Sequence, residues 1–198
     1  MQPTRVVRGT LRRLTRVLDT ILGASLFGVY LYGSLTQRAF DPARSDIDCI
    51  VVVRRDLTDA QLRKLRQWLA EAGLVDRWIP RLQMQLLLKG RLLRPDARGY
   101  LYQFAALRRS GSDGNPIIWM NALASGLTLR GPAPATFLPP ITSEMLYTAW
   151  ALETLPPRWH SLIRSAVESD RGKRSTLALP RIARFIEFVG AQLDESLA

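Results

Sequence analysis

The feature that most constrains the fold of this chain is a pair of apolar runs joined by a short polar loop, within residues 29–53. The first run ends in Gly33-Ser34, and Asp46-x-Asp48 opens the second. β-Branched residues dominate the second run, which is typical of a central strand covered on both faces. Residues two apart on a strand point the same way, so we expect Asp46 and Asp48 to share a face.

Two carboxylates close together at the start of a strand need a partner of opposite charge. At 4 Å and an effective dielectric near 20 they repel by roughly 4 kcal/mol. Hard divalent cations with oxygen ligands, Mg²⁺ above all, suit such a pair and normally arrive with the phosphates of a nucleotide. Gly33 would let the backbone approach a phosphate closely, and Ser34 has a hydroxyl to donate to it. The stretch therefore predicts a site for a metal ion and a triphosphate.

Composition narrows the classes of function. The 198 residues are 47% apolar, which is enough for a real core and argues against disorder. Cys49 is the one cysteine and His160 the one histidine, which excludes an internal disulfide and a histidine-based metal site. We expect Cys49 to be a small core residue of a cytoplasmic protein. The apolar stretch after the N-terminal arginines is broken by Gly23 and Gly28, which favours mature structure over a signal peptide, and no run reaches transmembrane length.

The net charge of +11 fits a polyanionic partner. However, 25 of the 28 basic residues are arginine and most are scattered along the chain. This distribution favours a genome-wide preference for arginine over a basic patch adapted to a partner. Nucleic acid is therefore a minority alternative as a partner, a membrane is not expected, and the sequence carries no signal about oligomeric state. The basic face of the N-terminal segment is interpreted as solvated surface.

Hydrophobic periodicity places helices and strands around the central loop. Thr58 is a good helix N-cap, and Gln61 completes a weak capping box. Several prolines between residues 132 and 140 mark a linker, and strand signals stop beyond it. We therefore expect two domains, 1–138 and 139–198, the second of them all-helical. The expected helices span 4–22, 58–72, 97–109 and 116–124, and the expected strands span 26–31, 48–53, 81–88 and 127–130.

The spacing between Gly33-Ser34 and Ser45-Asp46-Ile47-Asp48 resembles that of the nucleotidyltransferase superfamily of DNA polymerase β type. It is more closely similar to that of the aminoglycoside 3''-adenylyltransferases, the streptomycin and spectinomycin resistance enzymes. Looser similarity extends over most of the chain, at 126–132, 137–139 and 179–182. The resemblance implies an α+β fold, in which a small mixed-sheet nucleotidyltransferase domain is followed by a short all-helical C-terminal domain.

The same resemblance implies a reaction. A substrate hydroxyl would attack the α-phosphorus of ATP and release pyrophosphate, with an aminoglycoside-like acceptor as the family default and antibiotic resistance as the setting. The metal would neutralise phosphate charge while the protein positions the reactants. In the loop, Arg38 and Arg44 either contact phosphates or are solvated surface. The residues implied are Asp46 and Asp48 for Mg²⁺, and Gly33, Ser34, Ser45 and Arg44 for ATP.

Two departures from the family's pattern bear on activity. The family has a third carboxylate on the third strand, as general base or metal ligand. The matching position here is Gln83, followed on the same face by Gln85, and an amide cannot take a proton. A lost general base typically lowers the rate by about 10²–10⁴-fold. Glu153 or Asp170 from the helical part is the alternative source of a carboxylate. The second departure is length, because the chain ends soon after Arg181, where the resistance enzymes continue with further helices.

Two classes of function therefore stay open. The first is a Mg²⁺- and ATP-dependent nucleotidyltransferase, weakened by Gln83. The second is a catalytically degenerate domain that binds nucleotide or a polyanion as a regulatory or toxin–antitoxin-type partner. The intact motif favours the first, and the basic charge favours the second. We expect Trp119 and Trp150 to be core residues, although an aromatic side chain near the domain joint is an alternative platform for adenine.

Overall fold

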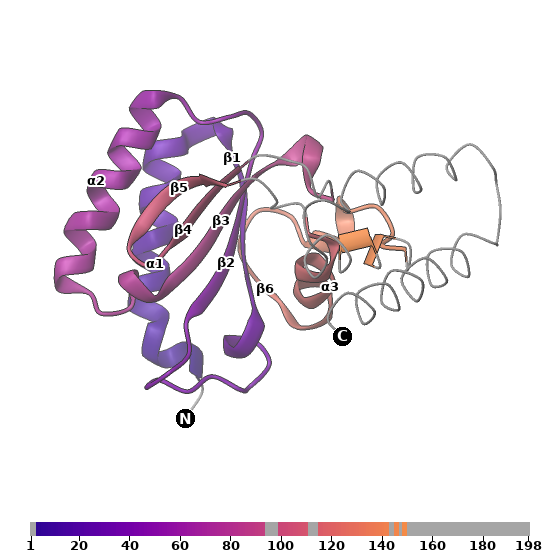
Figure 1. Cartoon of the computed structure of the whole chain (residues 1–198), viewed down its shortest axis with the longest axis horizontal. Coiled ribbons are helices and arrows are strands. Elements are labelled where there is room, and N and C mark those ends of the chain that lie inside the picture. The colour runs from indigo at the N-terminus through magenta and orange to yellow at the C-terminus, as the bar shows by residue number, and fades with distance from the viewer. Residues whose placement is uncertain (1–2, 94–98, 111–114, 143–144, 147, 150–198) are drawn as a thin grey trace, which may run out of the picture. The chain divides into compact units, whose positions relative to one another are not determined.

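The computed structural model describes residues 3–93, 99–110, 115–142, 145–146 and 148–149. The chain forms two compact units, Met1–Pro139 and Pro140–Ala198. The described part of the first unit holds a six-stranded sheet and three α-helices, which confirms the expected α+β fold with a small mixed sheet (Figure 1). Most of the second unit lies outside the described residues, and with it lie Trp150, Glu153, His160, Asp170 and the segment 179–182. The all-helical C-terminal domain therefore stays a prediction.

The strands follow the order β5-β4-β3-β2-β1-β6 across the sheet. Only β2 and β3 run parallel, and every other neighbouring pair is antiparallel. A parallel pair needs a crossover connection, and α2 supplies it. The strands are β1 (Leu26–Tyr32), β2 (Ile47–Val53), β3 (Leu82–Leu88), β4 (Gly99–Gln103), β5 (Ala106–Ser110) and β6 (Leu127–Arg130), and the helices are α1 (Pro3–Leu22), α2 (Asp59–Val75) and α3 (Pro116–Ser125).

The two faces of the sheet have different surroundings. Figure 1 shows α1 and α2 on one side of the sheet and α3 on the other. On β2, Cys49 and Val51 belong to the main apolar core with α1 and α2, whereas Asp48 and Ile50 do not. Successive side chains of a strand alternate between the faces, so Asp48 lies on the face opposite α1 and α2.

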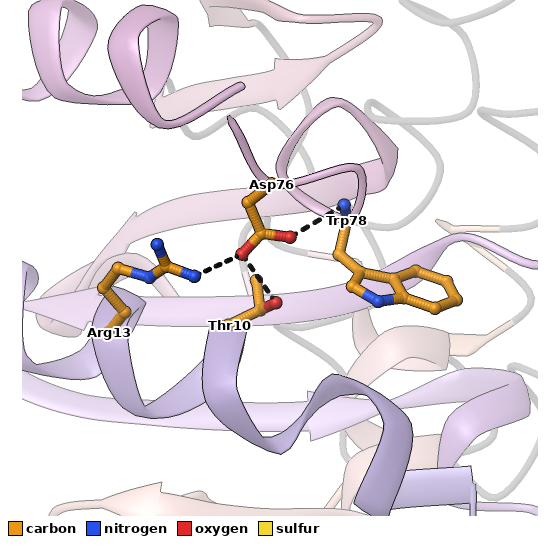
Figure 2. A network of polar contacts seen from close by, with 4 residues as sticks. All are labelled: Thr10, Arg13, Asp76 and Trp78. Carbon is orange, nitrogen blue, oxygen red and sulfur yellow. Dashed lines mark hydrogen bonds and ion pairs between the residues drawn. The ribbon is translucent and has the colours of Figure 1, made fainter. Parts of the chain in front are cut away.

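Helix α1 is held in place by apolar packing and by one buried carboxylate. Asp76 accepts hydrogen bonds from Thr10 Oγ1 at 2.8 Å, Arg13 Nη2 at 2.8 Å and Trp78 N at 3.0 Å (Figure 2). Three donors offset the loss of hydration that a buried carboxylate suffers. This network ties α1 to the connection between α2 and β3.

The helix expected over 97–109 is wrong, because the described residues of this segment form the β4–β5 hairpin. Its turn is Phe104-Ala105, with φ of 51° and 56°, the left-handed conformation of a two-residue hairpin turn. Buried Tyr100 and Tyr102 alternate with partly exposed Leu101, which is the period of a strand. The end expected for the second helix, at residue 72, is also wrong, because α2 continues to Val75.

Several local predictions are confirmed. Thr58 and Gln61 form the capping box, and Pro116 stands in the first turn of α3. Cys49 is a buried free thiol, and Trp119 is fully buried. None of the helices in the described ranges combines the length and the apolar character that a membrane span needs.

Candidate functional site

The candidate site forms where the loop from β1 returns to β2. A single 3₁₀ turn, Gly33–Leu35, follows β1 directly, and Asp48 is the second residue of β2. The two strands are antiparallel neighbours in which Tyr32 pairs with Asp48. This register brings the start of the turn against the Asp48 side chain, although the two lie fifteen positions apart in the sequence.

Gly33 is the residue that makes this contact possible. Its φ is +72°, and a Cβ placed on it would lie 2.1 Å from Asp48 Oδ2. The carboxylate thus occupies the space that any other side chain would need. The Gly33 carbonyl accepts hydrogen bonds from the backbone N–H groups of Thr36 and Gln37 at 3.1 Å and from Thr36 Oγ1 at 2.9 Å. The turn is therefore fixed by its own hydrogen bonds.

Ser34 presents a buried hydroxyl that has no hydrogen-bond partner among the residues that the structure describes. Buried polar atoms are nearly always paired, and leaving one unpaired typically costs about 1–3 kcal/mol. The orphaned hydroxyl belongs to the residue next to the glycine that packs on Asp48. A ligand with acceptor oxygens, such as a phosphate, would satisfy it.

The two aspartates have different environments. Asp46 is exposed in the loop, and Asp48 is partly buried on β2. Burial, and secondarily the charge of Asp46, raise the pKa of Asp48 to about 6. A bound cation would offset both effects.

This donor set fits Mg²⁺. Mg²⁺ is usually held by one or two carboxylates, and water and substrate phosphates complete its coordination. Asp46 and Asp48 would provide the two carboxylates. Within the described ranges, no group of three or more His, Cys, Asp or Glu side chains is placed to hold a metal ion. The pair would therefore depend on ligands from the nucleotide.

The loop between the turn and β2 is braced by a residue that the sequence analysis missed. Arg81 Nη1 donates to the Pro42 carbonyl at 2.7 Å, and Arg81 Nη2 donates to the Ser45 carbonyl. The Ser45 hydroxyl accepts a hydrogen bond from the backbone of Asp41 at 2.9 Å, so it shapes the loop while its own proton stays available. Arg44 is exposed on the same loop.

The strand register places two glutamines on the face that carries Asp48. In the parallel β2–β3 pair, Gln83 is the partner of Asp48 and Gln85 is the partner of Ile50. Gln83 Oε1 accepts a hydrogen bond from Gln103 Nε2 at 3.4 Å. Gln85 is 7% exposed, and its Oε1 has no hydrogen-bond partner within the described ranges. An amide therefore stands beside Asp48 where the resemblance implies a carboxylate.

Sequence reasoning missed Arg81 and Gln103 for different reasons. Arg81 precedes β3 and reaches the loop only because β3 lies parallel to β2, so that Leu82 pairs with Ile47. Gln103 ends β4, in the segment that was expected to be a helix. The alternation of Tyr100 and Tyr102 was the available signal for that strand.

Comparisons with known proteins show the fold but not a family. No protein-family model matches the chain, and no match emerges among curated proteins. Among solved structures, the chain is similar to spectinomycin adenyltransferase AAD(9) from Enterococcus faecialis, which was crystallised with ATP and spectinomycin. The TM-score is 0.57 at 15% sequence identity, and the similarity covers 94% of this chain and 99% of that chain. At this identity the likeness shows a shared fold.

Two toxin–antitoxin structures are more distant. One was crystallised with AMP-PNP and has a TM-score of 0.36 at 17% identity, over 79% of this chain and 98% of that chain. The other is a tri-AMPylated HEPN toxin with its MNT antitoxin from Shewanella oneidensis, with a TM-score of 0.35 at 16% identity, over 84% of this chain and 99% of that chain. These scores are too low to carry an argument.

Proposed function

We propose that this chain is a nucleotidyltransferase that moves AMP from ATP to a hydroxyl group of a small molecule. The observation that carries the proposal is the packing of the Gly33 turn on Asp48, with 2.1 Å between the position of a Cβ on Gly33 and Asp48 Oδ2. This packing supports the proposal because it sets the turn that leads into Ser34 against Asp48, two residues after Asp46. The fold shared with a spectinomycin adenyltransferase supports the same class of activity.

Each part of the site has a task in this proposal. Asp46 and Asp48 would hold Mg²⁺, which neutralises phosphate charge when bound. Asp48 must be ionised for this, and a pKa of about 6 leaves it ionised at neutral pH. The Ser34 hydroxyl would donate to a phosphate oxygen, and Ser45 and Arg44 would face the triphosphate from the loop.

In this proposal, the described residues account less well for activation of the acceptor hydroxyl than for binding of the metal and nucleotide. As the hydroxyl oxygen bonds to the α-phosphorus, the bond to pyrophosphate breaks and the hydroxyl proton must leave. Gln83, the register partner of Asp48, cannot take that proton. The proton would pass to water or to a carboxylate outside the described residues, such as Glu153 or Asp170. We therefore propose slow transfer, with an aminoglycoside-like polyol as the first acceptor class to test.

The test is a transfer assay with the full chain, α-labelled ATP, Mg²⁺ and a panel of hydroxyl acceptors that includes aminoglycosides. We expect label on an acceptor and release of pyrophosphate, both lost in Asp46→Asn. Asp56→Asn is the matched control, because Asp56 is an exposed carboxylate beyond the other end of β2. If the panel yields neither labelled acceptor nor pyrophosphate, transfer is refuted.

A second candidate function is favoured by Gln83 itself. A domain that keeps the metal and nucleotide residues but lacks the base would bind ATP without transferring AMP. Equilibrium binding of a non-hydrolysable ATP analogue with Mg²⁺ distinguishes the two candidates. Binding that Asp46→Asn abolishes, in a protein that transfers nothing, supports the binding domain. If Gln83→Glu then gains transfer activity, the missing carboxylate is the cause.

A further inference from the structure

A groove lies on the other side of the sheet from the candidate site, between α1 and the edge strand β6. Its cavity volume is about 530 Å³. Leu11 of α1, Leu31 of β1, and Leu127 and Leu129 of β6 supply its apolar lining. Leu31 belongs to the core packed under α1, whereas Asp48 lies on the opposite face. The groove is therefore separate from the proposed nucleotide site, and the inference does not depend on nucleotide transfer.

One wall of the groove is a row of arginines. Arg8, Arg12 and Arg16 stand four residues apart on α1, line the groove and are exposed. In the described part of the chain, none of the three has an ion-pair partner. Arg13 on the same helix differs, because it holds Asp76 (Figure 2). Asp19, the acid that lines the groove, is paired with Arg130. The row is thus uncompensated positive charge, and like charges four apart on a helix repel.

The spacing of the row matches an extended peptide. Helix residues four apart are separated by about 6 Å along the axis. Side chains on one face of an extended chain repeat about every 6.6–6.8 Å. Three alternate carboxylates of a peptide could therefore each meet one of the three arginines.

Strand β6 offers the backbone half of such an interaction. It is the outermost strand of the sheet, and in the described residues it pairs only with β1. Its outer edge has backbone groups that another strand can use. Leu127 on this strand is 45% exposed, which is high for a leucine at a groove. Strand addition to an exposed edge is a common way to bind a peptide.

We propose that this groove binds an acidic, extended segment of a partner protein, which adds as a strand to β6 and sets alternate carboxylates against Arg8, Arg12 and Arg16. Because alternate side chains of an extended segment share a face, the methylene groups of these acidic residues would lie over the leucines of the lining. None of the described residues that line the groove is aromatic. Single-stranded nucleic acid usually needs aromatic platforms, so the lining favours a peptide.

The test is fluorescence anisotropy of the full chain with a labelled heptapeptide in which leucine and glutamate alternate, at physiological salt. We expect saturable binding that Arg12→Glu with Arg16→Glu weakens at least tenfold. The control is Arg63→Glu with Arg66→Glu, the same charge change at exposed positions of α2, which should alter affinity less than twofold. Absence of binding, or equal losses in both double variants, would overturn the proposal. Circular dichroism checks that both variants are folded.

Two further kinds of measurement distinguish strand addition by a partner peptide from other occupants of the groove. N-methylation of alternate peptide amides should reduce affinity at least tenfold if the peptide adds to β6, and unchanged affinity would refute strand addition. A single-stranded oligonucleotide of matched charge that competes as well as the peptide would assign the groove to nucleic acid. If Asp194→Lys with Glu195→Lys raises peptide affinity tenfold, the acidic end of this chain is the occupant and the partner segment is refuted.

Discussion

The two faces of the central strands differ in how completely their side chains are packed and hydrogen-bonded. On the face toward α1 and α2, side chains such as Ile47, Cys49 and Met84 are fully buried in one apolar core. On the other face, the pKa of Asp48 is raised, and the side-chain oxygen of Gln85 has no partner in the described part of the chain. The same strands thus carry one face optimised for packing and one whose polar groups are left incompletely satisfied. Under the proposed function, polar residues of this second face bind ligand, while the core face contributes mainly to stability.

The largest expected effect tests the packed face. Met84→Ala removes a fully buried side chain, and large-to-small core substitutions of this kind typically cost about 2–5 kcal/mol. We expect this loss in urea unfolding, with unchanged affinity for the ATP analogue and Mg²⁺ under conditions where the variant is folded. A loss of affinity comparable to that of a site variant would show that the two faces are not separable.

The site face should respond in the opposite way. Asp48→Asn is expected to reduce affinity for the ATP analogue with Mg²⁺ at least a hundredfold, about 2.7 kcal/mol, because it removes one of the two carboxylates proposed to hold the metal. Isothermal titration calorimetry measures the affinity, with Asp56→Asn as the control at an exposed carboxylate. Retained affinity in Asp48→Asn would mean that the nucleotide site lies elsewhere.

Two glycines offer a matched pair for the next effect. Gly23 and Gly33 each begin a 3₁₀ turn at positive φ, but a Cβ on Gly23 would meet nothing within 4 Å, whereas one on Gly33 would collide with Asp48. Both alanine variants should lose about 1–2 kcal/mol through backbone strain. Only Gly33→Ala should also lose nucleotide affinity, by at least tenfold, because the carboxylate must move. Equal affinity of the two variants would remove the main support for the site.

The sequence predicted the features that depend on alternating polarity along a strand or on the spacing of residues close together in the sequence. The two strands around the loop are as expected, and Gln83 and Gln85 share one face of the third strand as expected, because side chains of a strand alternate with a period of two. The β4–β5 hairpin was missed because Phe104-Ala105 lacks the glycine or asparagine that normally marks such a turn. The contact of Arg81 with Ser45 was missed because it depends on the parallel neighbour of β2.

The raised pKa of Asp48 predicts a pH dependence of stability in the metal-free protein. Its folded pKa of about 6 lies above its ordinary value of 3.8, so the folded state binds the proton more tightly than the unfolded state. This contribution is complete below about pH 4 and is lost as pH rises through 6. Because Asp48 is partly exposed, we expect an effect on the order of 1 kcal/mol. Thermal melts from pH 4 to 8 should show this loss in the wild type relative to Asp48→Asn, and parallel curves would contradict the assignment.

The smallest expected effect concerns Gln85 on the same face. Gln85→Met keeps the length of the side chain and removes an acceptor that is unpaired among the described residues, so the free energy of unfolding should rise by about 1 kcal/mol or less. Urea unfolding measures the gain, and the conservative exchange Met84→Leu at the neighbouring core position should show none.

If Gln85 also contacts the bound acceptor, Gln85→Met will raise the KM for the acceptor while the affinity for the ATP analogue stays the same. A more stable variant with a weaker acceptor site would show that the incomplete polar face is maintained for binding; a destabilised variant would show that Gln85 has a structural role and that the division between the faces is not strict.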